Sequence, residues 1–170
     1  MDKIHVIIEE LKQRDYKSFD TFYNLTKNQV FYAIISIVKE KAEAEDLMQE
    51  VYMKFLEKID DYKPNSNPYA YLSTIGRNLA INYYNKNKRV FVSEELIESI
   101  PAEEEKEENE DIFKILDLLN PDEREIVTLH VINDLKFREI ASMVDKPLGT
   151  VLWIYNKAIK KLKEKAVDFL

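Results

Sequence analysis

The chain has 170 residues, of which 45% are hydrophobic, so it can form one ordinary domain or two small ones around packed cores. The absence of cysteine excludes a disulfide scaffold, a thiolate metal site and a cysteine nucleophile, and the presence of only two histidines disfavours histidine-based chemistry. The formal net charge is −7, and the two glycines, Gly76 and Gly149, belong to no phosphate-binding loop, so the composition favours an all-α protein over an α/β enzyme.

The first module is predicted over residues 1–90. Apolar residues recur at helical spacing over 3–13, 17–41, 42–59 and 69–86. The second of these stretches is either one long helix or two helices broken near Lys27–Asn28. Residues 60–68, DDYKPNSNP, contain two prolines and three polar turn formers, and therefore predict a loop.

The excess negative charge is confined to residues 91–111, which contain ten acidic side chains and one basic side chain. Like charges in such a block repel one another and favour an extended chain. We therefore predict an acidic flexible linker over 91–111, with a solvated helix end as the alternative.

The second module is predicted over residues 112–170. It begins with a short helix at 112–119, followed by a helix from Pro121 to about Ile132 that is capped by Asn120. A short helix at 137–144, a tight turn and a final helix from Pro147 to about Ala166 complete the module. Two helices joined in this way form the helix-turn-helix geometry of DNA-binding proteins.

Three helix faces are candidate functional surfaces. On 42–59, Asp46, Glu50, Met53 and Glu57 line one side with Gln49 adjacent; the stripe either docks a basic partner or is simply solvated. On 69–86, cations and amides alternate with tyrosines. This pattern is typical of helices that bind single-stranded bases by stacking, but tyrosines in it can also lie at the edge of the core. On the final helix, the polar face either reads duplex DNA or is the lysine-rich side of an ordinary hairpin.

Three stretches together resemble a known family. They are AEDLMQEVYMKFLEK (44–58), YAYLSTIGRNLAINYYNKNKR (69–89) and LNPDEREIVTLHVINDLKFREIASMVDKPLGTVLWIYNKAIKKLK (119–163). Their order and spacing resemble the extracytoplasmic-function (ECF) group of the bacterial sigma-70 family. The resemblance implies a sigma region 2 helical bundle, an acidic linker and a sigma region 4 helix-turn-helix.

The resemblance also implies partners and residue roles. The partners would be core RNA polymerase (through the clamp helices of its largest subunit and the flap of its second-largest), promoter DNA and an anti-sigma factor. Residues matching the polymerase-docking segment are Asp46, Leu47, Gln49 and Glu50, and Met53 of the same stripe is a further candidate for polymerase binding. Residues implied to bind DNA at the −10 element are Arg77, Asn78, Asn82 and Tyr83, and those at the −35 element are Thr150, Trp153, Asn156, Lys157 and Lys160. The basic residues that close the first module, Lys86, Lys88 and Arg89, are further candidates for DNA binding. The loop 60–68 matches the loop that captures a flipped base.

Some positions depart from the family pattern. Leu152 and Ile154, with Trp153 between them, occupy positions where many relatives have basic residues, and Pro68, Ser73 and Thr74 replace residues that are often aromatic or basic. These departures leave open how the −35 element is read and how strongly the promoter is melted.

Two other functions remain alternatives: a stand-alone helix-turn-helix regulator of duplex DNA, and a helical adaptor without nucleic-acid function. We expect no enzymatic activity, cofactor or metal site, because no convergent carboxylate pair, metal-ligand spacing or nucleophile–base set is visible. We expect a cytoplasmic protein without membrane insertion, because the sequence shows neither a signal-peptide pattern nor an apolar run of about 20 residues.

Overall fold

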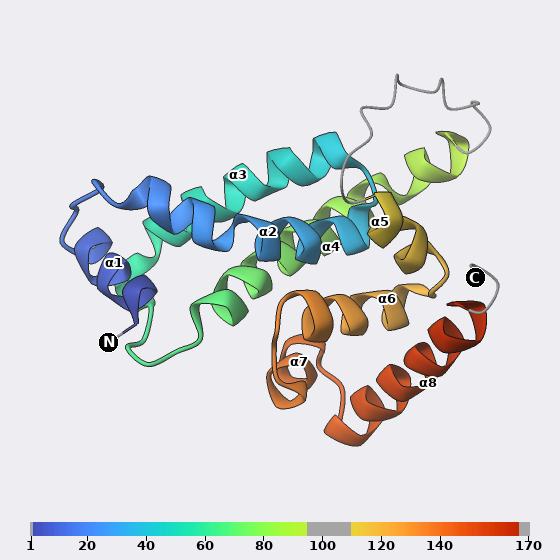
Figure 1. The fold of residues 1–170 in the computed structure, drawn as a ribbon. Coiled ribbons are helices and arrows are strands. Elements are labelled where there is room, and N and C mark those ends of the chain that lie inside the picture. Colours follow the sequence, from blue (N-terminus) through green and yellow to red (C-terminus); the bar gives the residue numbers. More distant parts are fainter. Residues whose placement is uncertain (1, 95–109, 167–170) are drawn as a thin grey trace.

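The computed structural model describes residues 2–94 and 110–166, and the side chains of 88–94, 110 and 166 are outside the described set. The described residues form helices and connecting turns without a strand (Figure 1), which confirms the all-α prediction. In chain order the elements are α1 (Lys3–Lys12), α2 (Phe19–Val38), α3 (Lys41–Glu57), η1 (Ile59–Asp61), α4 (Pro68–Glu94), α5 (Glu110–Asp117), α6 (Pro121–Val127), η2 (Thr128–Ile132), α7 (Phe137–Val144) and α8 (Leu148–Ala166). We call α1–α4 the first module and α5–α8 the second module.

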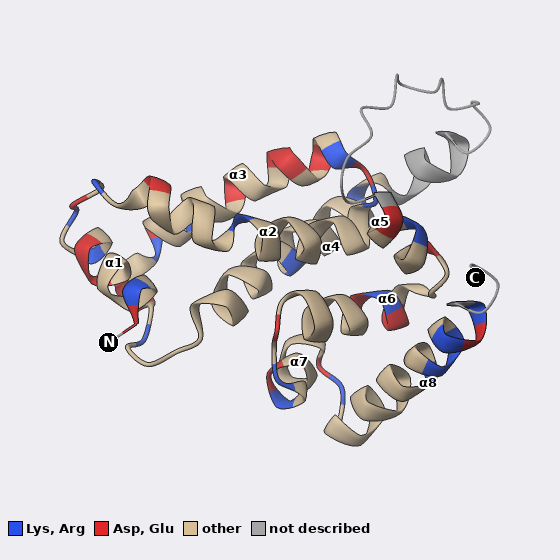
Figure 2. Cartoon of the chain, viewed as in Figure 1, with Lys and Arg blue, Asp and Glu red and all other residues tan. Residues whose placement is uncertain are grey.

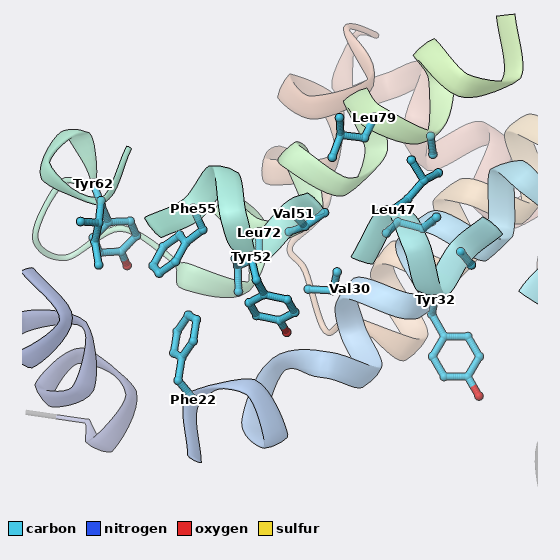
Figure 3. Close-up of a cluster of buried hydrophobic side chains, with 14 of the residues drawn as sticks. Phe22, Val30, Tyr32, Leu47, Val51, Tyr52, Phe55, Tyr62, Leu72 and Leu79 are labelled. Atoms are coloured by element: carbon cyan, nitrogen blue, oxygen red, sulfur yellow. The ribbon is translucent and has the colours of Figure 1, made fainter. Parts of the chain in front are cut away.

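The core of the first module lies between α2, α3 and α4 (Figure 3). Phe22 of α2 stacks on Phe55 of α3 with ring centroids 5.0 Å apart, and both side chains are fully buried. Gly76 lets α4 approach α2 closely, since a Cβ at this position would lie 3.2 Å from Ile34 Cγ1. The helices therefore cross where one of them lacks a side chain.

Of the two alternatives predicted for α2, the structure shows the single helix, and α4 is longer than predicted. Helix α2 is continuous through Lys27–Asn28, and it ends at Lys39, whose φ of 61° is left-handed. Thr26 lies inside α2, where its hydroxyl donates to the Phe22 carbonyl and shares a 2.6 Å hydrogen bond with the Tyr52 hydroxyl. Helix α4 runs to Glu94, well past the predicted end near Lys86, because no proline or glycine between these two residues stops it.

Of the predicted linker, residues 91–94 continue α4 and residues 110–111 begin α5. The remainder, 95–109, lies outside the described residues.

The start of α6 matches its sequence signals closely. The Asn120 side chain accepts a hydrogen bond from the Glu123 backbone N–H, and the Glu123 carboxylate accepts one from the Asn120 N–H, so the two residues form a capping box before Pro121. A π-helical turn at Thr128–Ile132 follows. Helices α7 and α8 are joined through Asp145, which has a left-handed φ of 55°, and they form the predicted helix-turn-helix.

The second module packs against the first. Its main cluster contains Ile126, Leu129, Leu135 and Ile140, and it also includes Ala33 of α2, which is 2% exposed. Phe113 of α5 lies 6.1 Å from the Tyr32 ring of α2 between centroids. The second module thus lies along α2 and α4 (Figure 1), a proximity that the sequence pattern did not indicate.

Glu123 also links α6 to α8. Its buried carboxylate accepts a 2.8 Å hydrogen bond from Lys161 Nζ. Burial alone would raise the pKa of the Glu123 carboxyl, but the hydrogen bonds from Lys161 and the Asn120 N–H outweigh it, so this pKa is lowered from its ordinary value of 4.5. The carboxylate's contribution to stability is complete above that value and is lost as the pH falls through the lower folded-state pKa.

We predict that Glu123→Gln lowers the free energy of unfolding by about 1–3 kcal/mol near neutral pH, because it removes the charge from a buried, charge-assisted hydrogen bond. The difference from the unsubstituted protein should shrink as the pH falls below the ordinary carboxyl pKa. Urea denaturation across this pH range measures it. Glu164→Gln, an exposed carboxylate on α8, is the control and should change stability by less than about 0.5 kcal/mol. A cost for Glu123→Gln that is the same at acidic and neutral pH would contradict the role of the charge.

Candidate polymerase and nucleic-acid interfaces

The outer side of α3 presents the acidic stripe to solvent. Asp46, Gln49 and Glu50 are exposed, and Met53 is 63% exposed although it is apolar. The spacing i, i+3, i+4 and i+7 places these four residues on one side of the helix, and acidic residues recur along α3 in Figure 2. Leu47 does not share this surface, because it is buried at 8% exposure with Val51 in the core of the first module.

On α4 the candidate DNA-binding residues fall into different environments. Asn78, Asn82 and Lys86 are exposed, whereas Tyr83 is half-buried at the edge of the first core. The side chains of Lys88 and Arg89 lie outside the described set.

Arg77 is covered by the second module. Its Nε donates to Glu125 Oε1 of α6, and its Nη1 donates to the Met143 carbonyl of α7 at 3.2 Å. The two charged side chains are only 17% and 14% exposed. Arg77 was expected to contact DNA at the −10 element, but the side of α4 that carries it is where the second module packs.

The loop 60–68 is held by α1. His5 Nε2 lies 3.2 Å from the Ser66 carbonyl oxygen, and Lys12 Nζ donates to the Tyr62 carbonyl at 3.0 Å. Inside the loop, the Tyr62 hydroxyl donates to the Ser66 carbonyl at 2.6 Å. Burial, with a smaller effect from Tyr71, raises the pKa of Tyr62 to about 12, so its hydroxyl stays protonated as a donor.

A cavity of about 660 Å³ opens beside this loop, between its residues Tyr62, Pro64 and Asn65 and α1 residues including His5 and Glu9. Its size falls within the range of small-ligand sites. The sequence carries no signal for this role of α1, since its contacts with the loop join residues 50 and 61 positions apart.

The exposed face of α8 brings its five candidate residues together. They are Thr150, Trp153, Asn156, Lys157 and Lys160. The Trp153 side chain is 63% exposed, and Lys157 Nζ lies 5.0 Å from its ring centroid, within cation–π range. Ile154, in contrast, is buried in the second core. Basic residues also mark the C-terminal part of α8 in Figure 2.

Within 2–94 and 110–166, no group of three or more histidine, aspartate or glutamate side chains is placed to hold a metal ion. Among the helices of these two segments, none combines the length and the apolar character needed to cross a membrane.

Comparison with known proteins identifies the class. Residues 22–90 match the Sigma-70 region 2 family, and residues 109–162 match the Sigma-70, region 4 family. The ECF RNA polymerase sigma factor EcfG of Rhodopseudomonas palustris is 31% identical over 75% of this chain and 74% of its own length. The ECF RNA polymerase sigma factor SigM of Bacillus subtilis is 28% identical over 89% of this chain and 98% of its own length. The solved sigma factor RpoE of Bartonella quintana, in complex with the anti-sigma factor NepR, has a TM-score of 0.69 at 28% identity and covers 87% of this chain and 96% of its own.

The chain therefore belongs to the sigma-70 family of RNA polymerase sigma factors, and within it to the ECF group. It is a promoter-directing subunit of bacterial RNA polymerase, which answers the choice left open between a sigma factor and a stand-alone regulator.

We predict that two substitutions on α3 differ in their effect on stability. Leu47→Ala should lower the free energy of unfolding by about 2–5 kcal/mol, because it leaves a cavity in the core. Met53→Ala should change it by less than about 0.5 kcal/mol, because the side chain is exposed. Urea denaturation of both variants measures the difference, and a comparable loss for Met53→Ala would mean that this face is packed within the protein.

Proposed function

We propose that this sigma factor divides its work among three surfaces. The outer side of α3 docks core RNA polymerase, α4 with the loop 60–68 binds and melts the −10 element, and α8 reads the −35 element. The observation that carries the proposal is the exposure of two chemically different faces on separate modules: an acidic face with Met53 on α3, and a basic, aromatic face with Trp153 and Lys157 on α8. The first suits a basic protein partner and the second suits DNA.

The domain boundaries follow from the same division. We propose residues 1–90 as region 2, residues 91–111 as an acidic linker and residues 112–170 as region 4. The polymerase performs the chemistry of RNA synthesis, and this chain supplies promoter specificity without a reaction of its own. Its site of action would be the cytoplasm, where the polymerase and promoters are.

On α8, the readout of the −35 element would rest on Trp153, Asn156 and Lys157. Ile154 is buried in the core and cannot contact DNA. Many relatives have a basic residue at this position, and this chain therefore lacks that basic contact. The Asn156 amide can pair with an adenine edge, and Lys157 can reach a guanine edge or a phosphate. The Trp153 ring supplies apolar contact to a thymine methyl.

An anti-sigma factor is a further candidate partner. The similar RpoE of Bartonella quintana was solved in complex with one, NepR. Exposed apolar side chains on both modules, Met53 and Trp153, offer contact area to a protein that binds both at once.

In vitro transcription with core polymerase on genomic fragments tests the function as a whole. Specific start sites that depend on the added chain are expected. A chain that neither binds core polymerase nor yields such start sites would contradict the proposal.

For the docking surface, we predict that Glu50→Lys weakens binding to core polymerase by about tenfold or more, because it places a positive charge opposite a basic partner surface. Fluorescence anisotropy of the labelled chain, titrated with core polymerase, measures the affinity. Glu9→Lys on α1 makes the same charge change at an exposed position outside the proposed surface, so its affinity should be unchanged. Equal affinities for Glu50→Lys and the unsubstituted chain would rule out the docking role.

For the −35 surface, we predict that Lys157→Ala lowers the affinity of the holoenzyme for promoter DNA. It should also reduce the slope of log affinity against log salt concentration by about one unit, because one phosphate contact is lost. Lys3→Ala, an exposed lysine on α1, is the control and should leave the slope unchanged. An unchanged slope for Lys157→Ala would eliminate the phosphate contact.

A further inference from the structure

Helix α1 is fixed to the first module by its apolar side. Its four apolar residues at helical spacing are at most 4% exposed and belong to the first core: Ile4, Ile7, Ile8 and Leu11. The match to the Sigma-70 region 2 family begins at residue 22, so α1 lies outside it. A helix anchored in this way is a rigid base from which polar side chains can hold a neighbouring segment in place.

Two polar side chains of α1 bind the backbone of the loop 60–68, which passes beside this helix (Figure 1). His5 Nε2 lies 3.2 Å from the Ser66 carbonyl oxygen, and because a carbonyl oxygen can only accept, His5 is the donor and carries its hydrogen on Nε2. Lys12 Nζ donates to the Tyr62 carbonyl at 3.0 Å and lies 5.8 Å from the Tyr62 ring centroid. One helix thus holds both ends of the turn between Tyr62 and Ser66.

The turn that α1 holds contains a residue in an uncommon conformation. Asn65 has a left-handed φ of 69°, a region that residues other than glycine rarely adopt, although asparagine does so more readily than most. The carbonyl of the next residue, Ser66, accepts hydrogen bonds from His5 and, at 2.6 Å, from the Tyr62 hydroxyl. A backbone conformation of this kind persists where the surrounding contacts fix it, and the donors on Ser66 supply such contacts.

The position of the loop also determines where α4 begins. Asn67 follows Ser66 directly and caps α4, because its Oδ1 accepts hydrogen bonds from the backbone N–H groups of Tyr69 and Ala70 at 3.0 and 3.3 Å. The cavity of about 660 Å³ lies between the loop and α1. Helix α1 therefore fixes one wall of this cavity and, through the loop, the first turn of the helix proposed to bind the −10 element.

We propose that His5 and Lys12 are positioning residues for promoter melting, which hold the loop 60–68 in the conformation that receives a base flipped out of the −10 element. The inference rests on the proposed role of this loop in binding the −10 element, and it adds α1 to the surface that does so. A loop that is fixed in advance binds the base without a further ordering cost, so the apparent affinity is proportional to the fraction of molecules whose loop is in the competent conformation. Neither side chain has to touch DNA for this effect.

Four variants separate the hydrogen bonds from the other effects of substitution. His5→Ala removes the donor to Ser66, whereas His5→Gln keeps a nitrogen donor at a similar reach. Lys12→Met removes the donor to Tyr62 and keeps an unbranched side chain for packing. Lys3→Met makes the same change at an exposed position of α1 and is the control. Each variant is assembled into holoenzyme with core polymerase at a saturating concentration of the chain.

The measurement is the contribution of one base to the affinity of the holoenzyme for a fluorescent oligonucleotide. Its sequence is the non-template strand of the −10 element at a start site found by in vitro transcription. Replacing one nucleotide at a time with an abasic residue identifies the captured base as the position where affinity falls most. His5→Ala and Lys12→Met should each reduce this abasic penalty by about three- to tenfold, because the intact strand loses a prepared loop while the abasic strand does not use it. His5→Gln and Lys3→Met should retain the penalty.

A general structural defect would lower the affinity for intact and abasic strands alike and leave the penalty unchanged, and that result in His5→Ala would overturn the proposal. A loss of the penalty in His5→Gln equal to that in His5→Ala would also overturn it, because the hydrogen bond would then not be what holds the loop. If no abasic residue weakens binding of the unsubstituted holoenzyme, base capture itself is refuted and the positioning role falls with it. A clear penalty that none of the α1 substitutions alters refutes the positioning role alone.

Discussion

Helix α2 is packed on two sides, and this double burial constrains the rest of the structure. Ile34 meets Gly76 of α4 in the first core, while the neighbouring Ala33 enters the core of the second module. Backbone carbonyls of α2 also bind the second module, since those of Gln29 and Ser36 accept hydrogen bonds from its side chains. A helix in this position has no fully polar face, which accounts for the nearly continuous apolar run from Val30 to Val38.

Arg124 shows how a charge is accommodated at this junction. Its side chain is 5% exposed, and its guanidinium donates to the carbonyls of Leu116 and Leu119 at the end of α5, and at 3.5 Å to that of Ser36 in α2. Burial lowers the pKa of Arg124, but the carbonyls at a helix C-terminus favour a cation and satisfy its donors. One side chain thereby links α5, α6 and α2, which explains why the second module has a defined position against the first.

The structural features that could be predicted are those whose sequence signals lie within a few neighbouring residues. Asn120, Pro121 and Glu123 mark the start of α6 within four positions, and the helix-turn-helix followed from apolar spacing alone. Leu47 lies in an apolar series with Val51 and Phe55 at helical spacing, which is typical of a core residue, whereas its assignment to the docking surface came from the family pattern. The pairing of Arg77 with Glu125, 48 residues apart, could not be foreseen, because an outward arginine on an isolated helix has the same pattern as one covered by another module.

The Arg77–Glu125 contact lies in the seam between the two modules and contributes little to holding them together. Two charges that are mostly removed from water lose hydration, so the net gain from pairing them is small even when the geometry is good. The contact between the modules therefore depends mainly on the apolar packing around Ala33 and the amide hydrogen bonds of Asn133. Those contacts, more than the ion pair, determine how tightly the second module is held against the first.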